Sequence, residues 1–218
     1  NGMAEIKFEG GLSVAGEIKL YVLGLNAYPV TLDVTALPNN SAYVVYNEFA
    51  LNDANAQIDY NESLTMDMTF KNMGDVNAEN VTATLSCDNT EYIEITKATA
   101  NVGNIGANSD VTVEDAFSFE VSDDVPNNTN VKFFITCSDG TDTWTSKFNA
   151  NINAPEFAIV NPASVGVNPG ETATVEFTIV NKGNSDADNT MFRVFDSFDD
   201  VEIEKERRRP RSLPAMPG

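Results

Sequence analysis

Four oxygen-bearing side chains in one polar loop are the residues best suited to chemistry in this chain. Asp53, Asn55, Asp59 and Glu62 lie in the segment LNDANAQIDYNE with the spacing D-x-N-x-x-x-D-x-x-E. Such loops can wrap a calcium ion, because side-chain and carbonyl oxygens converge on one point. The spacing departs from an EF-hand loop, which needs glycine at the sixth place and glutamate at the twelfth. Two interpretations stay open: a structural calcium site formed by these four residues, and a solvated loop closed by Asx turns.

Cys87 and Cys137 are the only thiols, and the chain contains no histidine. The missing imidazole removes the usual general base and the commonest zinc ligand, so we expect no enzyme activity from these residues. Both cysteines fall in phase with core-facing positions of predicted strands. If those strands run antiparallel in one sheet, their C-terminal ends point to opposite edges, and a bridge needs Cα atoms within about 7 Å. Buried free thiols and a disulfide, which a secreted setting would favour, both stay open.

Aromatic residues gather near the end of the central segment. Phe133, Phe134, Trp144 and Phe148 could form a sugar-stacking platform if their rings shared an exposed face. Rings in such strands more commonly fill a sandwich core or pair across strands. A glycan platform and a packed core are therefore the two interpretations of this group.

The charge of the chain limits its partners. Lys and Arg total 13 against 33 Asp and Glu, a net charge of −20 over 218 residues. Such a surface repels phosphate backbones and anionic lipid headgroups, so we expect neither nucleic acid nor a membrane surface as a partner. No run of about 18 apolar residues occurs, so we expect no membrane insertion.

Short alternating segments predict an all-β fold. In Leu64 to Phe70, apolar residues occupy every second place, and Val81 to Cys87 repeats the pattern. Seven such segments with intervening turn signals and no helical period indicate a Greek-key sandwich of two antiparallel sheets. The predicted strands are Tyr43 to Asn47, Leu64 to Asn72, Asn80 to Cys87, Tyr92 to Thr96, Val111 to Val121, Val131 to Cys137 and Thr143 to Ile152.

Part of this pattern is written twice. LTMDMTFKNMGDVNAENVTATLS, from Leu64, matches ATVEFTIVNKGNSDADNTMFRVF, from Ala173, with Gly74 and Gly183 separated by 109 positions (183 − 74 = 109). Similarity at the spacing of one small domain predicts consecutive modules, each with its own core. Strands of the later copy are expected at Phe157 to Val160, Thr172 to Asn181, Thr190 to Asp196 and Val201 to Ile203.

The predicted organisation is one complete sandwich with a partial one on either side. Residues 1–37 end in a hairpin, Ile18 to Leu25 with Val30 to Leu37, that would supply the last strands of a preceding domain. Residues 42–153 form the complete sandwich, and residues 155–204 the first part of a similar one. Residues 205–218 form a tail with five of the 13 basic residues and three prolines. This tail is interpreted as a truncation, frame error or cloning artefact, or as a genuine disordered basic segment.

SAYVVYNEFALNDANAQIDYNESLTMDMTFKNMGDVNAENVTATLS, with VEDAFSFEVSDDVPNNTNVKFFITCSDGTDTWTSKF, resembles a known type of module. The segments are similar to the immunoglobulin-like, cell-adhesion-related (CARDB-like) repeats that follow the catalytic domain of secreted gingipain-type cysteine peptidases. GGLSVAGEIKLYVLGLNAYPVTLDVTA resembles the end of the domain directly after the peptidase unit. Modules of this kind often carry an acidic loop that ends in Gly-Glu. Here Asn61 replaces that glycine, whereas Gly170 keeps it in the later copy.

The resemblance implies a secreted or cell-surface parent protein. It carries over no catalytic residue, because the family's catalytic pair lies upstream of every motif matched here. The expected role is that of tandem immunoglobulin-like spacers, stabilisers or docking surfaces whose partners are neighbouring domains. The alternative is an adhesin module that binds a cell-surface protein or glycan, with calcium as its one candidate cofactor.

Overall fold

The computed structural model describes residues 16–22, 28, 30–36, 40–160, 166, 168–192 and 211–215. The regular elements in these residues are all strands, which confirms the predicted all-β class. No helix among them has the length and apolarity of a transmembrane span. The strands are β1 (Gly16–Val22), β2 (Val30–Ala36), β3 (Val44–Leu51), β4 (Ile58–Asp59), β5 (Ser63–Asn72), β6 (Ala78–Cys87), β7 (Ile93–Lys97), β8 (Thr99–Ile105), β9 (Asp110–Val121), β10 (Thr129–Ser138), β11 (Thr143–Asn153), β12 (Phe157–Val160), β13 (Thr178–Asn181), β14 (Ala187–Thr190) and β15 (Arg211–Leu213).

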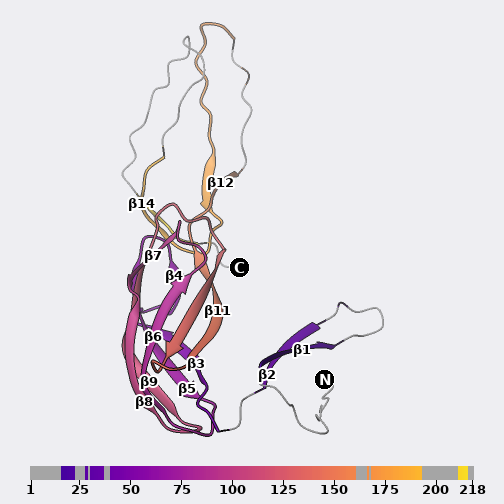
Figure 1. The fold of residues 1–218 in the computed structure, drawn as a ribbon. Helices are drawn as coiled ribbons and strands as arrows, with labels where there is room; N and C mark the ends of the chain where they lie inside the picture. The colour runs from indigo at the N-terminus through magenta and orange to yellow at the C-terminus, as the bar shows by residue number, and fades with distance from the viewer. Residues whose placement is uncertain are drawn as a thin grey trace.

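Strands β3 to β11 form a sandwich of two sheets (Figure 1). One sheet has the order β3-β5-β9-β7 and the other the order β4-β11-β10-β6-β8. All pairings are antiparallel except that of β4 with β11. Alternation along β5 explains why it lies in a half-buried sheet: Leu64, Met66, Met68 and Phe70 are all buried, while the residues between them are not. The removal of these four apolar side chains from water drives the two sheets together.

Stacked aromatic rings connect the two sheets through the core. Phe119 on β9 lies 5.5 Å, centroid to centroid, from Phe133 on β10. Phe133 in turn lies 5.1 Å from Phe148 on β11, and Phe148 lies 4.6 Å from Phe49 on β3. Each such pair adds about 0.5–1.5 kcal/mol beyond the burial of its area. The core is therefore continuous from one sheet to the other.

The seven strands predicted for the sandwich are all present, but two others escape the sequence pattern. These are the two-residue β4 and the longer β8. Only Ala98 separates β7 from β8, yet β7 pairs with β9 in one sheet and β8 with β6 in the other. A segment that changes sheets also changes its buried face, which breaks the alternation. Asn101, Gly103 and Asn104 further weaken the strand signal of β8.

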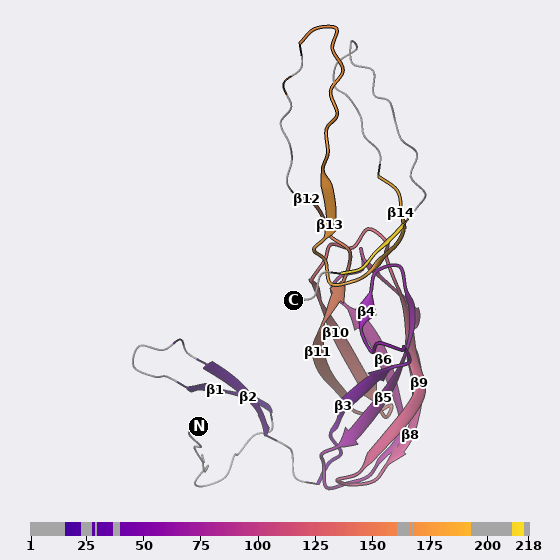
Figure 2. The same cartoon turned by 180° about the vertical axis from the view of Figure 1, so that it is seen from behind.

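Two smaller groups of strands lie beyond the sandwich (Figures 1 and 2). The hairpin of β1 and β2 pairs Gly16 with Ala36 and Val22 with Val30, close to the predicted pairing. At the other end, β12 pairs with β13, and β14 pairs with β15. We call residues 154–160, 166, 168–192 and 211–215 the C-terminal unit.

The strands of the C-terminal unit follow the sequence pattern in part. β12 has the predicted bounds, whereas the strand expected at Thr172 to Asn181 is regular only over Thr178–Asn181. β14 covers Ala187–Thr190 and reaches only the first residue of the strand expected at Thr190 to Asp196. Among the described residues β13 has one strand partner, β12, so fewer hydrogen bonds hold its early residues in a ladder. Val201 to Ile203 and residues 193–196 lie outside the described residues. In the predicted basic tail, Arg211–Leu213 form β15.

Candidate functional site

The acidic loop between β3 and β5 is closed by its own side chains. The Asp53 carboxylate accepts a hydrogen bond from the Asn55 N–H (3.0 Å), and the Asn55 side-chain oxygen accepts one from the Gln57 N–H (2.7 Å). The Asn55 amide donates to Asp59 Oδ2 (2.8 Å), and Glu62 Oε2 accepts from the Asp59 N–H (3.1 Å). The first two of these four contacts are Asx turns. Among the described residues, no three Asp, Glu, Cys or His side chains already converge as a metal site.

Strand β4 fixes Asp59 beneath this loop. Ile58 and Asp59 pair with Ile152 and Asn153 at the end of β11, and the Tyr60 N–H donates to the Asn153 carbonyl (2.9 Å). The Asp59 residue is only 8% exposed, and its Oδ1 is buried without a hydrogen-bond partner. A buried acceptor without a donor costs about 1–3 kcal/mol, and more when it is charged. Asp59 is thus the one residue of this loop that has a buried side-chain oxygen without a hydrogen-bond partner.

The turn after β13 and the start of β14 approach the acidic loop and leave an open hollow between them, which we call the junction hollow. Four carboxylates line it: Asp59 and Glu62 from the sandwich, and Asp186 and Asp188 from the C-terminal unit. The other lining residues are all uncharged and polar: Asn55, Gln57, Tyr60, Asn61, Asn184 and Ser185. Burial raises the pKa of Glu62, the Asp59 N–H bond lowers it, and the charges of Asp59 and Asp53 raise it further. The net rise therefore comes first from burial of the carboxyl group, and the two neighbouring charges add to it.

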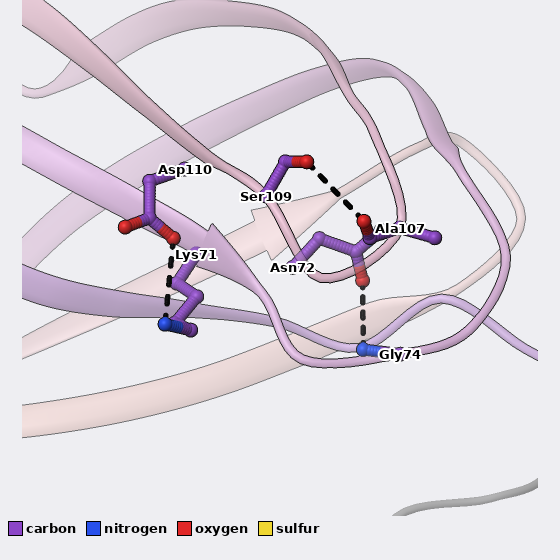
Figure 3. A network of polar contacts seen from close by, with 6 residues as sticks. All are labelled: Lys71, Asn72, Gly74, Ala107, Ser109 and Asp110. Carbon is purple, nitrogen blue, oxygen red and sulfur yellow. Dashed lines mark hydrogen bonds and ion pairs between the residues drawn. The ribbon is translucent and has the colours of Figure 1, made fainter.

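A buried asparagine holds the opposite end of the sandwich. Asn72 is fully buried; its Oδ1 accepts from the N–H groups of Tyr43 and Gly74, both at 3.0 Å. Its Nδ2 donates to the carbonyls of Val76 (2.8 Å) and Ile105 (3.2 Å). Figure 3 shows the hydrogen bond from the Gly74 N–H to Asn72, beside the surface ion pair of Lys71 and Asp110. All four hydrogen-bonding positions of the amide are used, which is the full capacity of this side chain.

The corner has no room for a side chain at Gly74. A Cβ atom there would lie 2.2 Å from the carbonyl oxygen of Ser41. The backbone of residues 41–43 passes so close that a larger residue would have to move it. The asparagine and the glycine therefore work together, one bonding the incoming chain and the other leaving room for it.

The same arrangement recurs 109 residues later. The Asn181 side chain accepts from the N–H groups of Glu156 and Gly183, both at 3.0 Å, and donates to the carbonyls of Ser185 (2.8 Å) and Leu213 (3.1 Å). A Cβ on Gly183 would lie 2.1 Å from the Ala154 carbonyl oxygen. The tail residue Leu213 occupies the place that Ile105 holds at the first corner.

A second pair of positions follows the same spacing. Asn61 has a backbone φ of +55°, and Gly170 has a φ of +84°. Both lie in the left-handed region, where glycine is unstrained and asparagine is the best tolerated substitute. The two residues are 109 positions apart (170 − 61 = 109). The conformation explains why asparagine can replace glycine at the end of the acidic loop.

Polar contacts connect the sandwich to the C-terminal unit. Asn127, in the loop between β9 and β10, accepts from the N–H groups of Ala154 (3.1 Å) and Asn184 (3.3 Å). The Asn184 side chain donates to Asn128 Oδ1 (2.7 Å). The corner turn of one unit is thus bonded to the end loop of the other. The sequence pattern predicts the turn that contains Asn184, but it does not predict its contact with the β9–β10 loop.

The cysteines are free thiols, as one of the two interpretations predicts. Their strands β6 and β10 are antiparallel neighbours, with Cys87 opposite Phe133 and Cys137 opposite Ala83. Four positions along the ladder separate them, about 13 Å, which is too far for a bridge. Burial raises the pKa of Cys137 to about 12 and also raises that of Cys87. Neither is an activated nucleophile at neutral pH.

The aromatic rings do not form the predicted platform. Phe133, Trp144 and Phe148 are buried in the core, and Phe134 projects from the other face of β10. Alternation along a strand places neighbouring residues on opposite faces, so these four rings do not share one exposed surface. The packed-core interpretation is correct for Phe133, Trp144 and Phe148.

Comparison of the chain with protein-family models gives no match, and comparison with curated proteins gives none either.

Proposed function

We propose that this chain is a non-catalytic spacer of consecutive immunoglobulin-like modules in a secreted or cell-surface protein. Its partners are the neighbouring domains of the same protein, and the resemblance of its modules supports a gingipain-type cysteine peptidase as the parent. The acidic surface favours solubility and disfavours nucleic acid and membranes as partners.

The observation that carries this proposal is the repeated corner. Asn72 and Asn181 each bond the incoming chain, their own turn and a strand beyond it, with the same donors and acceptors. At the second corner the turn also bonds the loop of Asn127. A corner that fixes both the entering chain and its neighbour gives successive units a defined connection, which is what a stiff spacer needs.

The chemistry of the thiols supports a non-catalytic role. The sequence has no histidine to activate them, and burial keeps the pKa of Cys137 at about 12. A cysteine nucleophile works as the thiolate, which requires a lowered pKa and access to substrate. Nothing in the described sandwich supplies either condition to Cys137.

Two measurements test the spacer proposal on the whole chain. Small-angle X-ray scattering should give the profile of a rigid, elongated particle, and a cysteine-peptidase assay should show no turnover. A compact or freely flexing particle would contradict the spacer role. Turnover that is lost in Cys87→Ser or Cys137→Ser would overturn the non-catalytic assignment, with Ser138→Ala as the matched control on the same strand.

A calcium-dependent adhesin module is the second candidate function. Its support is the buried, unpartnered Oδ1 of Asp59, a residue that lines the junction hollow together with three other carboxylates. The carbohydrate form of this candidate has less support, because the rings of Phe133, Trp144 and Phe148 are buried. Binding to a glycan array in calcium, abolished by a chelator, would favour the adhesin over the spacer.

A further inference from the structure

The junction hollow concentrates negative charge without a basic side chain to balance it. Its four carboxylates come in equal number from the sandwich and from the C-terminal unit, and no Lys or Arg is among its lining residues. Like charges brought together in a partly buried site repel one another unless a cation or solvent screens them. Asp186 and Asp188 are exposed, whereas Asp59 is not.

The buried oxygen of Asp59 is the independent sign of a ligand. Its Oδ2 accepts the Asn55 amide, but Oδ1 is buried and accepts nothing. β4 pairing and the Glu62 contact to the Asp59 N–H hold the residue in this position. A cation would supply the missing partner and neutralise the surrounding charge together.

We propose that a divalent cation, with calcium preferred, binds in the junction hollow and joins the two units through Asp59, Glu62, Asp186 and Asp188. The donors are all oxygens, which suits a hard cation. Calcium accepts six to eight oxygens in flexible geometry, whereas magnesium demands a near-ideal octahedron and zinc favours nitrogen and sulfur.

This site differs from a calcium loop built on Asp53 and Asn55. Asp53 is not among the residues that line the junction hollow, and its carboxylate accepts the Asn55 N–H within the loop. The junction ligands come instead from two distant segments, in which Asp59 and Asp186 are separated by 127 positions (186 − 59 = 127). Because no three carboxylates of the described residues already converge, the exposed Asp186 and Asp188 side chains must rotate inward as the ion binds.

The inference deepens the proposed spacer function, on which it rests, by adding a calcium-dependent connection between units. The test is isothermal titration calorimetry of calcium chloride into the whole chain after chelator treatment and dialysis. We expect one calcium per chain, at least tenfold weaker binding in Asp59→Asn and in the double variant Asp186→Asn/Asp188→Asn, and weaker binding of magnesium than of calcium.

Two control variants localise the ion. Asp75→Asn/Asp142→Asn makes the same charge change as the junction double variant, at exposed turns of the opposite end of the sandwich, and should bind calcium normally. Asp53→Asn should also bind normally. Equal binding in wild type and in Asp186→Asn/Asp188→Asn would overturn the junction site, as would loss of binding in Asp53→Asn alone or no calcium binding by the wild type.

Folding and function can be separated in the same experiment. Circular dichroism in chelator checks each variant, and the exposed positions of Asp186 and Asp188 keep the double variant informative if Asp59→Asn fails to fold. A rigid scattering profile without calcium binding would overturn the site and leave the spacer function. Calcium binding by a flexible particle would overturn the spacer function and leave the cation site.

Discussion

The two asparagine corners use the same hydrogen bonds in surroundings of very different packing. At Asn72 the adjoining strands β3 and β5 pair from Val44 to Leu51, and the core residues beside them are buried. At Asn181 the strands β12 and β13 pair over four residues, and Ile159 is 58% exposed. The corner is therefore a local motif that forms without a deep core. Stability comes from the partner strands that cover the apolar face.

The largest expected difference concerns aromatic burial. Phe133→Ala should lower the free energy of unfolding of the sandwich by about 3–5 kcal/mol, because it opens a cavity in the core. Phe157→Ala should leave the free energy of unfolding of the sandwich almost unchanged, because Phe157 lies in the C-terminal unit, is 42% exposed and loses mainly its contact with Phe192. Urea unfolding followed by the fluorescence of Trp144, the single tryptophan, reports the sandwich directly. Equal effects of the two variants would contradict the proposed contrast between the units.

Removal of the corner amides should give the next largest difference. Asn72→Ala leaves two carbonyls and two N–H groups of the corner without their partner and should destabilise the sandwich by about 3 kcal/mol. Asn181→Ala removes the same bonds from the C-terminal unit and should leave the Trp144 transition almost unchanged. Hydrogen exchange should instead increase at Glu156 and Gly183. A shift of the Trp144 transition in Asn181→Ala would show that the two units unfold together.

The rate of thiol labelling should also distinguish the two asparagine corners. Cys137 is buried with a pKa of about 12, so alkylation at pH 8 requires the sandwich to open. Asn72→Ala should accelerate its labelling several-fold, whereas Asn181→Ala should not. Mass spectrometry of alkylated peptides separates Cys137 from the half-buried Cys87, which should react faster. Fast labelling of Cys137 in the wild type would argue against a closed core.

The smallest effect is the pH dependence contributed by Glu62. Its folded pKa is raised above 4.5, so the folded state holds this proton more tightly than the unfolded state. The resulting stabilisation is present below 4.5 and is lost as pH rises through the raised pKa. Glu62→Gln should flatten this part of the stability–pH profile, measured by urea unfolding at a series of pH values. An unchanged profile would show that the burial of Glu62 and the charges beside it have no energetic effect.

Several features of the fold follow from sequence patterns alone. Alternation from Leu64 to Phe70 predicts a strand with one buried face, and the structure confirms it. The spacing of 109 predicts that Asn181 and Gly183 repeat the environment of Asn72 and Gly74, and their hydrogen bonds agree. These predictions succeed because alternation and turn chemistry are local, and each residue carries most of the signal itself.

Tertiary structure decides what depends on distant segments. The sequence by itself determined an all-β chain of alternating strands with a repeated turn and a polar, acidic loop. It did not determine that β8 leaves the sheet of β7, that Leu213 completes the second corner, or that Asp59 becomes buried. The burial of Asp59 requires β4 to pair with the far end of β11, and the junction hollow requires a unit more than 100 residues away. Long-range packing sets such contacts, and residue type alone does not encode it.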